Sequence, residues 1–572
     1  MLPLFFNYHG RVLPAATSIV FIIIFYSLGK LLCRTIAARM RVRRLKGLGI
    51  PIAPHSLLFG HIPMFADFGR AHPPDVNIHH FHTWLASPAI RKKYFPGLDK
   101  LPPVVYLDLC PVGPSFALVY DPIAAAQFTQ DHSLPKLRHS VEYLKPLTQN
   151  KDIVSTEGHV WKVWRSRFSP GFSSRNMIAL LPELIEDVTI FARRLQSRAG
   201  EHHTFGQVFP LKELATDLAF DSICRATLGM RLDQQSKTSD TPLKKTLLDQ
   251  VRSMNLRASE LRGLLHRRMP WHTAMVAKNN RIMNSLINPF ILQNLQSEER
   301  PDKVKTVISL AVQSLRKGDR QIMGSRSEPR DDFIDVLGSN IKAFLFAGQD
   351  TTASTICFMM KCLQENHDCL AELRAEHDLV LGPDPGAAPD TLRSQPHLLY
   401  QLPYTLGVIK ETLRLHTLAS TARQAHGEFS VTARDSTIPY PLQGFAPWIA
   451  APAIHRDPDY WPRPNDFLPE RWTKREGDSL YPCKEAWMPF SLGPRNCIGM
   501  ELAMTELRLV CVLVARSFDM EPAWGAWDEK RGTQATPGHQ VDGERLYGVD
   551  TGPVQPKDGM PVHVRTRKVS RE

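Results

Sequence analysis

The stretch Phe490-Ser-Leu-Gly493-Pro-Arg495-Asn-Cys497-Ile-Gly499 decides the fold expected for this chain. It places a cysteine between two glycines, two residues after an arginine and immediately before a helical stretch at 500–517. Free N–H groups and the dipole at a helix amino terminus stabilise a thiolate, the form of cysteine that ligates metal. Glycines let the backbone approach a flat cofactor closely. A lone cysteine is usually structural, so the prediction that Cys497 binds metal depends on the whole pattern.

This stretch fits F-x-x-G-x-R-x-C-x-G without a mismatch and resembles the haem-binding loop of the cytochrome P-450 family. The resemblance implies haem b, with Cys497 as the axial ligand and with Phe490, Gly493, Arg495 and Gly499 beside the cofactor. A thiolate ligand pushes electron density onto haem iron and favours O–O cleavage, whereas histidine suits oxygen carriage. We therefore expect a haem-thiolate monooxygenase.

A second motif, Ala347-Gly-Gln-Asp350-Thr351-Thr, lies inside a long apolar helix predicted from 332 to 363. Polar groups cost free energy there if they are buried unpaired. A threonine hydroxyl that bonds back to a carbonyl can open a helix locally and admit water. The family resemblance implies that Thr351 hydrogen-bonds the bound oxygen and that Asp350 relays protons. The alternative is a helix kink without a catalytic role.

Two further motifs predict a buried ionic network. Glu411-Thr-Leu-Arg414 places opposite charges at i and i+3 on one helix face, where they can pair. Such pairs are common on surface helices, but the later run Phe467-Leu-Pro-Glu-Arg471-Trp supplies an arginine that resembles the third member of the family's network. We expect Glu411, Arg414 and Arg471 to support the thiolate loop and to take no part in chemistry.

Arginines are also predicted to hold the haem carboxylates. Trp161 and Arg165 are four residues apart, hence on one helix face, and in the family such a pair meets a haem propionate. Arg423 and Arg495 resemble the other propionate partners, because a guanidinium group binds a carboxylate bidentately. Each arginine alone could equally be a solvated surface charge.

The amino terminus predicts a membrane anchor. Residues 12–32 carry one charge, Lys30, and are long enough to cross hydrocarbon as a helix. The alternative is a cleaved signal peptide, but no small-residue cleavage pattern precedes the basic block. Only Arg11 precedes the span, whereas Lys30, Arg34 and the basic run at 39–46 follow it, which favours a cytosolic catalytic domain.

We accordingly divide the chain into an anchor at 1–33, a basic and proline-rich connector at 34–65 and one haem domain at 66–572. The anchor resembles that of fungal microsomal members, which implies a single-pass protein of the endoplasmic reticulum membrane. The formal net charge is +13. Its only dense basic run follows the apolar span and is not interleaved with aromatic residues, so a membrane is favoured over nucleic acid as the partner.

The secondary-structure pattern predicts a mainly α protein with a small β part. Period-3.6 spacing indicates helices at 157–168, 176–198, 210–228, 243–262, 332–363, 367–382 and 402–416. Runs at 102–109 and 115–120 indicate a β-hairpin, and 560–566 a strand. Residues 296–330 and 524–556 are predicted to be long loops. Nine cysteines without a C-x-x-C pair indicate a reducing compartment and no disulfide scaffold.

The partners expected from the resemblance are dioxygen, a hydrophobic small molecule and a separate NADPH-dependent reductase. No G-x-G-x-x-G follows a strand and no flavin domain is attached, so electrons must come from another protein. Fungal members of this kind suggest a terpenoid or polyketide substrate. We expect substrate contacts from 137–153, 255–290, Phe344, Phe346 and 418–421. Thr417 stands where relatives often carry proline.

Two other functions stay open from sequence. Related haem-thiolate proteins isomerise or dehydrate oxygenated lipids without external oxygen, but those generally lack the acid and alcohol that Asp350 and Thr351 supply here. A non-catalytic haem sensor or carrier at the membrane is the other alternative. Oxygen consumption coupled to product formation would separate both from a monooxygenase.

Overall fold

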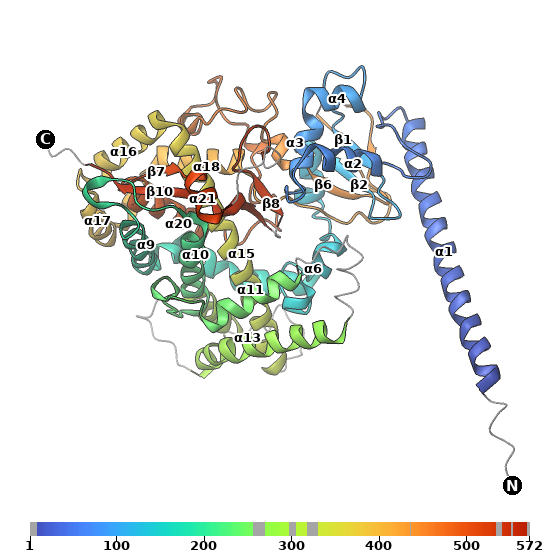
Figure 1. Ribbon diagram of the computed structural model, residues 1–572, viewed down its shortest axis with the longest axis horizontal. Coiled ribbons are helices and arrows are strands. Elements are labelled where there is room, and N and C mark those ends of the chain that lie inside the picture. The colour runs from blue at the N-terminus through green and yellow to red at the C-terminus, as the bar shows by residue number, and fades with distance from the viewer. Residues whose placement is uncertain are drawn as a thin grey trace, which may run out of the picture.

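The computed structural model describes residues 9–254, 269–296, 305–316, 330–434, 436–532, 540–550 and 553–568. Helices make up most of the body, and short strands form small sheets among them (Figure 1). The predicted mainly α class with a small β part is therefore confirmed.

The helices and strands have the following bounds. The helices are α1 His9–Gly47, α2 Ile62–Ala71, α3 His80–Ala86, α4 Pro88–Tyr94, α5 Pro122–Ala126, α6 Arg138–Thr148, α7 Gly158–Phe168, α8 Ser174–Ala179, α9 Leu181–Gln196, α10 Leu211–Leu228, α11 Pro242–Met254, α13 Pro270–Gln296, α14 Val307–Arg316, α15 Arg330–Glu365, α16 His367–Leu381, α17 Ala388–Ser394, α18 Pro403–Leu415, α19 Ala451–Ile454, α20 Met500–Val510 and α21 Trp524–Arg531. The strands are β1 Val104–Leu107, β2 Phe116–Val119, β3 Phe209–Pro210, β4 Ser430–Val431, β5 Tyr440–Pro441, β6 Ala446–Ile449, β7 Phe518–Pro522, β8 Gly548–Asp550, β9 Val554–Pro556 and β10 Pro561–Thr566.

Most of the predicted helices are present with nearly the predicted ends. They are α7, α10, α15, α16 and α18. The helix predicted at 176–198 is instead two helices, α8 and α9, which meet at Leu180. Pro182 lies in the first turn of α9, where its missing N–H is tolerated, whereas inside a continuous helix it would break a hydrogen bond. Helix α11 begins as predicted, and residues 255–262 of that prediction lie outside the described residues.

Both predicted loops contain regular structure, so these two predictions are wrong. Helix α14 lies within 296–330, because Val307, Ile308 and Ala311 recur at helical spacing and are fully buried. The tail at 524–556 contains α21 and the paired strands β8 and β9. In both segments the apolar stretches are short and the flanking residues are polar. This composition favours the prediction of a loop over that of a helix or strand.

The predicted hairpin and the predicted final strand are confirmed. Strands β1 and β2 pair antiparallel with Val104 opposite Val119, and β6 adds to β2 in parallel. Strand β10 pairs antiparallel with β3 and β7. Helix α15 packs against α10 and α18 in the largest apolar cluster of the described residues, so it crosses the centre of the helical body.

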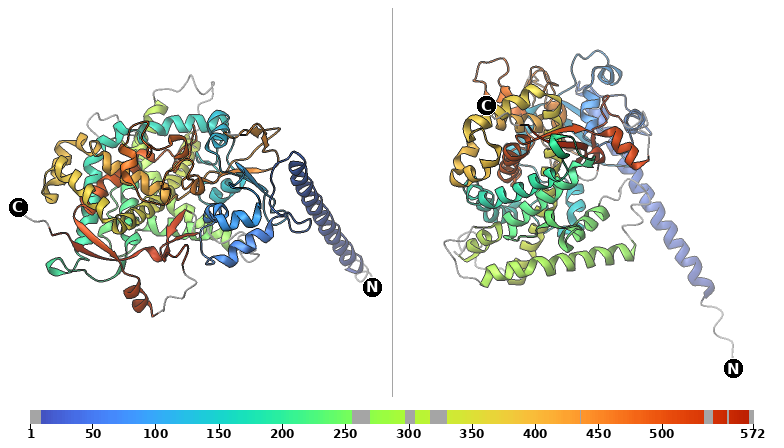
Figure 2. Two further views of the ribbon diagram at one scale, coloured as in Figure 1. Left: turned by 90° about the horizontal axis from the view of Figure 1, so that it is seen from above. Right: turned by 60° about the vertical axis from the view of Figure 1, so that its left-hand side comes forward.

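Helix α1 projects from the body, and both views of Figure 2 show its amino-terminal part standing clear of the other elements. Its segment from Phe21 to Gly47 is long and apolar enough to cross a membrane, and only 6% of its most apolar window is buried. The helix continues without a break into the body. There Arg39, which is almost fully buried, forms an ion pair with Asp108 and donates to the carbonyl oxygens of Leu57 at 3.1 Å and Cys110 at 2.8 Å.

Candidate active site

The thiolate loop is closed by backbone hydrogen bonds just before α20. The N–H of Cys497 donates to the carbonyl of Phe490 at 2.9 Å, and the N–H of Asn496 donates to the carbonyl of Gly493 at 3.1 Å. Gly499 is the N-cap of α20. The sulfur therefore lies near a helix amino terminus, as the sequence predicts, two residues before the cap.

Gly493 is required by the backbone of this loop. It has a φ of +73°, and a Cβ built on it would lie 2.2 Å from the carbonyl oxygen of Thr129. We expect Gly493→Ala to displace the loop and to lower the amount of bound haem in purified protein, measured by haem absorbance per mole of protein. Left-handed strain alone costs about 1–2 kcal/mol. Gly477→Ala is the matched control, because Gly477 has a φ of +96° and open space around it; equal loss in both variants would contradict the steric argument.

The electrostatic surroundings of Cys497 are mixed. Burial raises the pKa of its thiol, while a backbone hydrogen bond from Gly499 and the positive charges of Arg165 and Lys136 lower it. Cys497 is nevertheless exposed, although protein atoms lie close enough around it to raise the pKa of its thiol. A metal ion at the sulfur would supply the additional positive charge that a thiolate needs there.

Three of the predicted cofactor residues lie next to this loop and also hold it. Arg165 donates to the carbonyl oxygen of Asn496 at 2.9 Å and to its side-chain oxygen at 2.8 Å. The guanidinium of Arg495 lies over the ring of Trp161 at 4.8 Å, forms an ion pair with Glu157 and donates to the carbonyl of Ile153 at 3.0 Å. Arg495 therefore hydrogen-bonds protein groups in addition to the contact with a haem propionate that is predicted for it.

Arg423 differs from these arginines because it is fully buried and its three side-chain nitrogens have no hydrogen-bond partner among the described residues. Its backbone N–H donates to the carbonyl of Pro447 at 2.8 Å, which holds the residue against β6. Burial and, to a smaller extent, the positive charge of Arg495 lower the pKa of Arg423 to about 10. A buried guanidinium without partners is costly. The Arg423 guanidinium lies among the charged neighbours of Cys497. There it would bind the carboxylates of a haem, the cofactor that the sequence pattern predicts.

Lys136 and Glu157 belong to the same cluster, and no local sequence pattern points to either residue. The backbone of Lys136 forms a β-bridge with Arg423, and its N–H donates to Glu157 at 2.9 Å. Burial, together with Arg423 and Arg495, lowers the pKa of the Lys136 amine to about 7. Neither residue lies in a motif, so only their position in the fold reveals them.

The acid and the alcohol of the second motif lie on different sides of α15. The hydroxyl of Thr351 donates to the carbonyl of Ala347 at 2.8 Å, the backward bond that the sequence predicts. Ala347 is exposed and Thr351 half-buried, whereas the Asp350 side chain is only 4% exposed and pairs with Lys212 of α10. Consecutive helical residues point about 100° apart, which explains the separation.

The predicted ionic network is assembled and completely buried. Arg414 Nη2 lies 2.7 Å and Arg471 Nε 3.0 Å from the same oxygen of Glu411, and all three side chains are 0% exposed. Arg414 also donates to the carbonyls of His455 and Pro464, each at 2.6 Å. The network therefore links α18 to the segment at 455–471, which precedes the thiolate loop.

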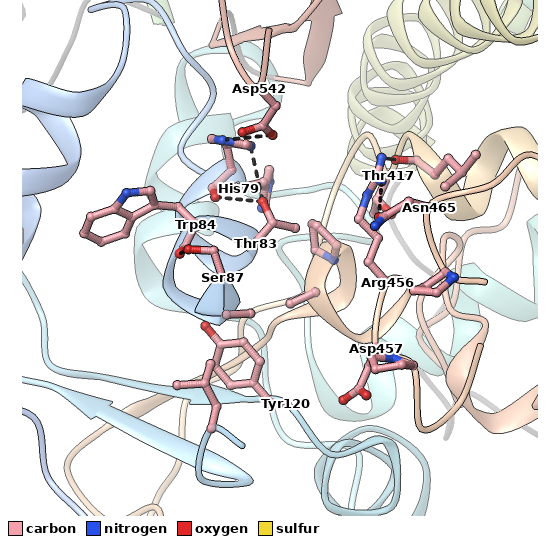
Figure 3. Close-up of a pocket in the computed structure, with 18 of the residues that line it drawn as sticks. His79, Thr83, Trp84, Ser87, Tyr120, Thr417, Arg456, Asp457, Asn465 and Asp542 are labelled. Atoms are coloured by element: carbon pink, nitrogen blue, oxygen red, sulfur yellow. Dashed lines mark hydrogen bonds and ion pairs between the residues drawn. The ribbon is translucent and has the colours of Figure 1, made fainter. Parts of the chain in front are cut away.

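A cavity of about 1070 Å³ lies apart from Cys497, between α3 and the segments at 415–418, 452–465 and 541–554. Figure 3 shows Thr83 and Tyr120 on one side of it and Thr417, Arg456 and Asp457 on the other. Leu418, predicted to contact substrate, lines this cavity. Phe344 does not fit that prediction well, because its ring packs into the core against Phe168 and Phe172 at 5.1 and 5.2 Å. Residues 255–268 of the predicted contact region lie outside the described residues.

Glu506 lies on α20 and is fully enclosed in the core. Burial and, to a smaller extent, the negative charge of Asp187 raise its pKa to about 8. Folding then favours the protonated acid, so stability is present at low pH and falls as pH rises through the interval from the ordinary glutamate value to about 8. We expect Glu506→Gln to remove this pH-dependent loss of stability. The free energy of unfolding of the variant, relative to that of the parent protein, should therefore rise by up to about 1.4 kcal/mol per pH unit. Urea unfolding at several pH values measures it.

The exposed Glu529 of α21 provides the control for this experiment. Glu529→Gln should leave the pH dependence of unfolding unchanged, because an exposed carboxylate has nearly the same environment in both states. A Glu506→Gln curve parallel to that of the parent protein would contradict a buried, protonated Glu506.

Comparisons with known proteins agree with this geometry. A family model described as Cytochrome P-450 matches residues 91–534. The cytochrome P-450 monooxygenase polC of Polytolypa hystricis is 35% identical over 535 residues, which cover 92% of this chain and 91% of the relative. The cytochrome P-450 monooxygenase acrF of Aspergillus aculeatus is 29% identical over 496 residues, covering 82% and 96%. The crystal structure of the cytochrome P-450DA haem domain aligns with a TM-score of 0.65 at 20% identity, covering 91% and 97%.

The chain therefore belongs to the cytochrome P-450 family. Its class is that of the haem-dependent monooxygenases, which in general use dioxygen, a reductase partner and hydrophobic substrates. Membership implies a haem whose iron is held by a cysteine thiolate. The apolar helix α1 suggests a membrane anchor.

Proposed function

We propose that this protein is a membrane-bound monooxygenase of fungal secondary metabolism that inserts one oxygen atom into a terpenoid or polyketide. The observation that best supports a haem site here is the buried Arg423. Its guanidinium has no hydrogen-bond partner among the described residues and lies in the charged cluster around Cys497. A haem b bound there, with Cys497 as ligand, supplies the reduction of dioxygen and the oxygen transfer. The fungal relatives named as monooxygenases support the class of pathway.

Each residue of the site then has a defined task. Arg423, Arg165 and Arg495 hold the cofactor's carboxylates, with the ring of Trp161 stacked on Arg495. The carbonyl of Phe490 accepts from the N–H of Cys497, and a Cβ built on Gly499 would lie 3.9 Å from the sulfur. The network of Glu411, Arg414 and Arg471 keeps the loop in place.

The acid and the alcohol handle protons. Thr351, whose hydroxyl bonds the Ala347 carbonyl, can swing to donate a hydrogen bond toward the space that the exposed Ala347 borders. Asp350 accepts protons on an adjacent side of α15 and passes them inward.

Electrons come from a separate NADPH-dependent reductase in this proposal. The anchor at 1–33 and connector at 34–65 hold a haem domain at 66–572 on the cytosolic face of the endoplasmic reticulum membrane. The exposed apolar surface of α1 and the basic residues that follow it support this placement.

Gene deletion combined with metabolite comparison tests the proposal. The deletion strain should accumulate a precursor one oxygen atom lighter than the lost product, and the purified protein with reductase and NADPH should convert that precursor with oxygen taken from O₂. Isotope-labelled O₂ detects the transfer by mass spectrometry. A precursor of the same mass as the product, or one heavier by a water molecule, that is converted without labelled oxygen would favour an isomerase or a dehydratase instead.

A further inference from the structure

The cavity of about 1070 Å³ beside α3 has no role in the site described above. Of the described residues that line it, none is Cys497, Thr351 or Arg423, which belong to the predicted haem site. Small-molecule sites have volumes of about 300–1,000 Å³, so this cavity has room for a ligand of its own. The polar groups and rings in its wall indicate which kind of ligand that is.

Asn77 supplies a hydrogen-bond donor that the protein does not use. Its side chain is only 3% exposed, lines the cavity, and has an amide nitrogen without a hydrogen-bond partner among the described residues. The amide oxygen accepts from the backbone N–H of His79 at 2.8 Å, which fixes the side chain. The buried Nδ1 of His79, in the same wall, also has no partner among the described residues. A buried polar atom left unpaired costs about 1–3 kcal/mol, and a ligand oxygen at Asn77 would offset this cost.

Aromatic rings supply apolar surface in the same wall. The hydroxyl of Tyr120 donates to the carbonyl of His82 at 3.3 Å, so a ligand meets mainly the ring of this residue. Phe358 and His416 are stacked with ring centroids 4.6 Å apart, and both line the cavity. Rings of this kind bury a large apolar area against a ligand.

The charges in the wall favour a neutral ligand. Arg456 and Asp457 lie on one side of the cavity and Asp542 lies on the other (Figure 3). A carboxylate ligand would meet the two aspartates, and an ammonium ligand would meet the arginine, so either ion is repelled by part of the wall. Burial lowers the pKa of His79 and that of His80 to about 4, so both imidazoles are neutral at pH 7 and do not attract an anion.

We propose that this cavity is a second small-molecule site, separate from the haem, and that its ligand is a neutral apolar molecule with a carbonyl or hydroxyl oxygen. The oxygen accepts a hydrogen bond from the amide nitrogen of Asn77. The apolar body of the ligand lies against Tyr120 and the Phe358–His416 pair. The inference goes beyond the oxygenation proposed above and does not depend on it, because no residue of the haem site takes part.

The test uses the full-length holoprotein with the azole clotrimazole bound to the haem iron, so that the distal face of the haem is occupied. Three probes share one adamantane body: the neutral ketone 1-acetyladamantane, 1-adamantanecarboxylate and 1-adamantylammonium. The tyrosines are replaced by 3-fluorotyrosine, and the ¹⁹F resonance of Tyr120 is assigned with Tyr120→Phe. We expect the ketone to shift this resonance saturably and to bind at least about 10-fold more tightly than either ion.

Variants of two wall residues test the assigned contacts. Asn77→Asp keeps the oxygen that accepts from the N–H of His79 but removes the donor, so it should weaken ketone binding about 10-fold. Thr83→Phe fills part of the cavity and should abolish the shift. Thr83→Val is the matched control, because the Thr83 hydroxyl already donates to the carbonyl of His80 at 3.0 Å; it should bind the ketone like the parent protein. The carbonyl-bound spectrum and the thermal unfolding midpoint show whether each variant is intact.

Four results would overturn the inference. The first is a Tyr120 resonance that the ketone does not shift saturably, and the second is unchanged ketone binding in an intact Thr83→Phe variant. Tighter binding of either ion than of the ketone would show that the class of ligand is wrong. A shift seen only without clotrimazole would show that the cavity is an extension of the haem site. Unchanged ketone affinity in Asn77→Asp would contradict the hydrogen bond assigned to Asn77.

Discussion

Cys497→Ala should abolish monooxygenation and change the spectrum of any haem that remains bound. The variant removes the thiol that lies in the cluster of Arg165, Lys136 and the amino terminus of α20. Without a thiolate ligand, electron density is no longer pushed onto the iron, and cleavage of the O–O bond loses its driving force. The measurements are the absorption spectrum of the reduced, carbonyl-bound protein, the haem content and the rate of product formation.

Cys483→Ala is the control for this variant. Cys483 lies in the same part of the chain and is half-buried, and its thiol donates a weak hydrogen bond to Glu485 at 3.6 Å. Its substitution should leave haem content and spectrum unchanged. An unaltered carbonyl-bound spectrum in Cys497→Ala would mean that another residue binds the iron, and the proposed site would have to be abandoned.

Glu411→Gln should destabilise the folded protein by about 3–5 kcal/mol, because two buried guanidinium groups lose their only counter-charge within the network. Both oxygens of Glu411 are used. One bonds Arg471 and the N–H of Leu468, and the other bonds Arg414 and the indole N–H of Trp472 at 3.0 Å. The free energy of urea unfolding, followed by both haem absorbance and far-UV circular dichroism, measures the loss.

Asp390→Asn gives the matched comparison. Asp390 and Arg393 form the same i,i+3 pair, but their side chains are 86% and 41% exposed. An exposed pair contributes about 0–1 kcal/mol, so this variant should unfold almost like the parent protein. A Glu411→Gln variant of similar stability would show that the arginines find other partners and that the network is not what holds the loop.

The residues whose chemistry is local were predictable from sequence. The pairs Glu411–Arg414 and Ala347–Thr351 are three and four residues apart, and the loop at 490–499 is one continuous stretch of ten residues, so helix and turn geometry brings their key groups together. The structure shows the backward bond of Thr351 and the shared carboxylate of Glu411 where the sequence predicts them. Strong period-3.6 patterns likewise gave the ends of α10, α15 and α18 to within two residues.

Contacts between distant segments were not predictable. Lys212 and Asp350 are 138 residues apart, and Lys136 and Arg423 meet through a bridge between unrelated segments. Helix α13, 27 residues long, was missed because its apolar positions do not form a clean stripe and Pro289 lies inside it. Tertiary packing, which buries Met283 and Ile287, supplies the stability that the local pattern lacks.

The unbroken passage of α1 into the body has a mechanical consequence. Arg39 binds the 57–58 loop and the turn after β1 at once, and it is paired with a fully buried carboxylate. Rotation of the body about the axis of α1 would break several hydrogen bonds of the buried Arg39 guanidinium. Helix α1 is therefore a rigid extension of the body, so a membrane that held its amino-terminal part would also fix the tilt of the body.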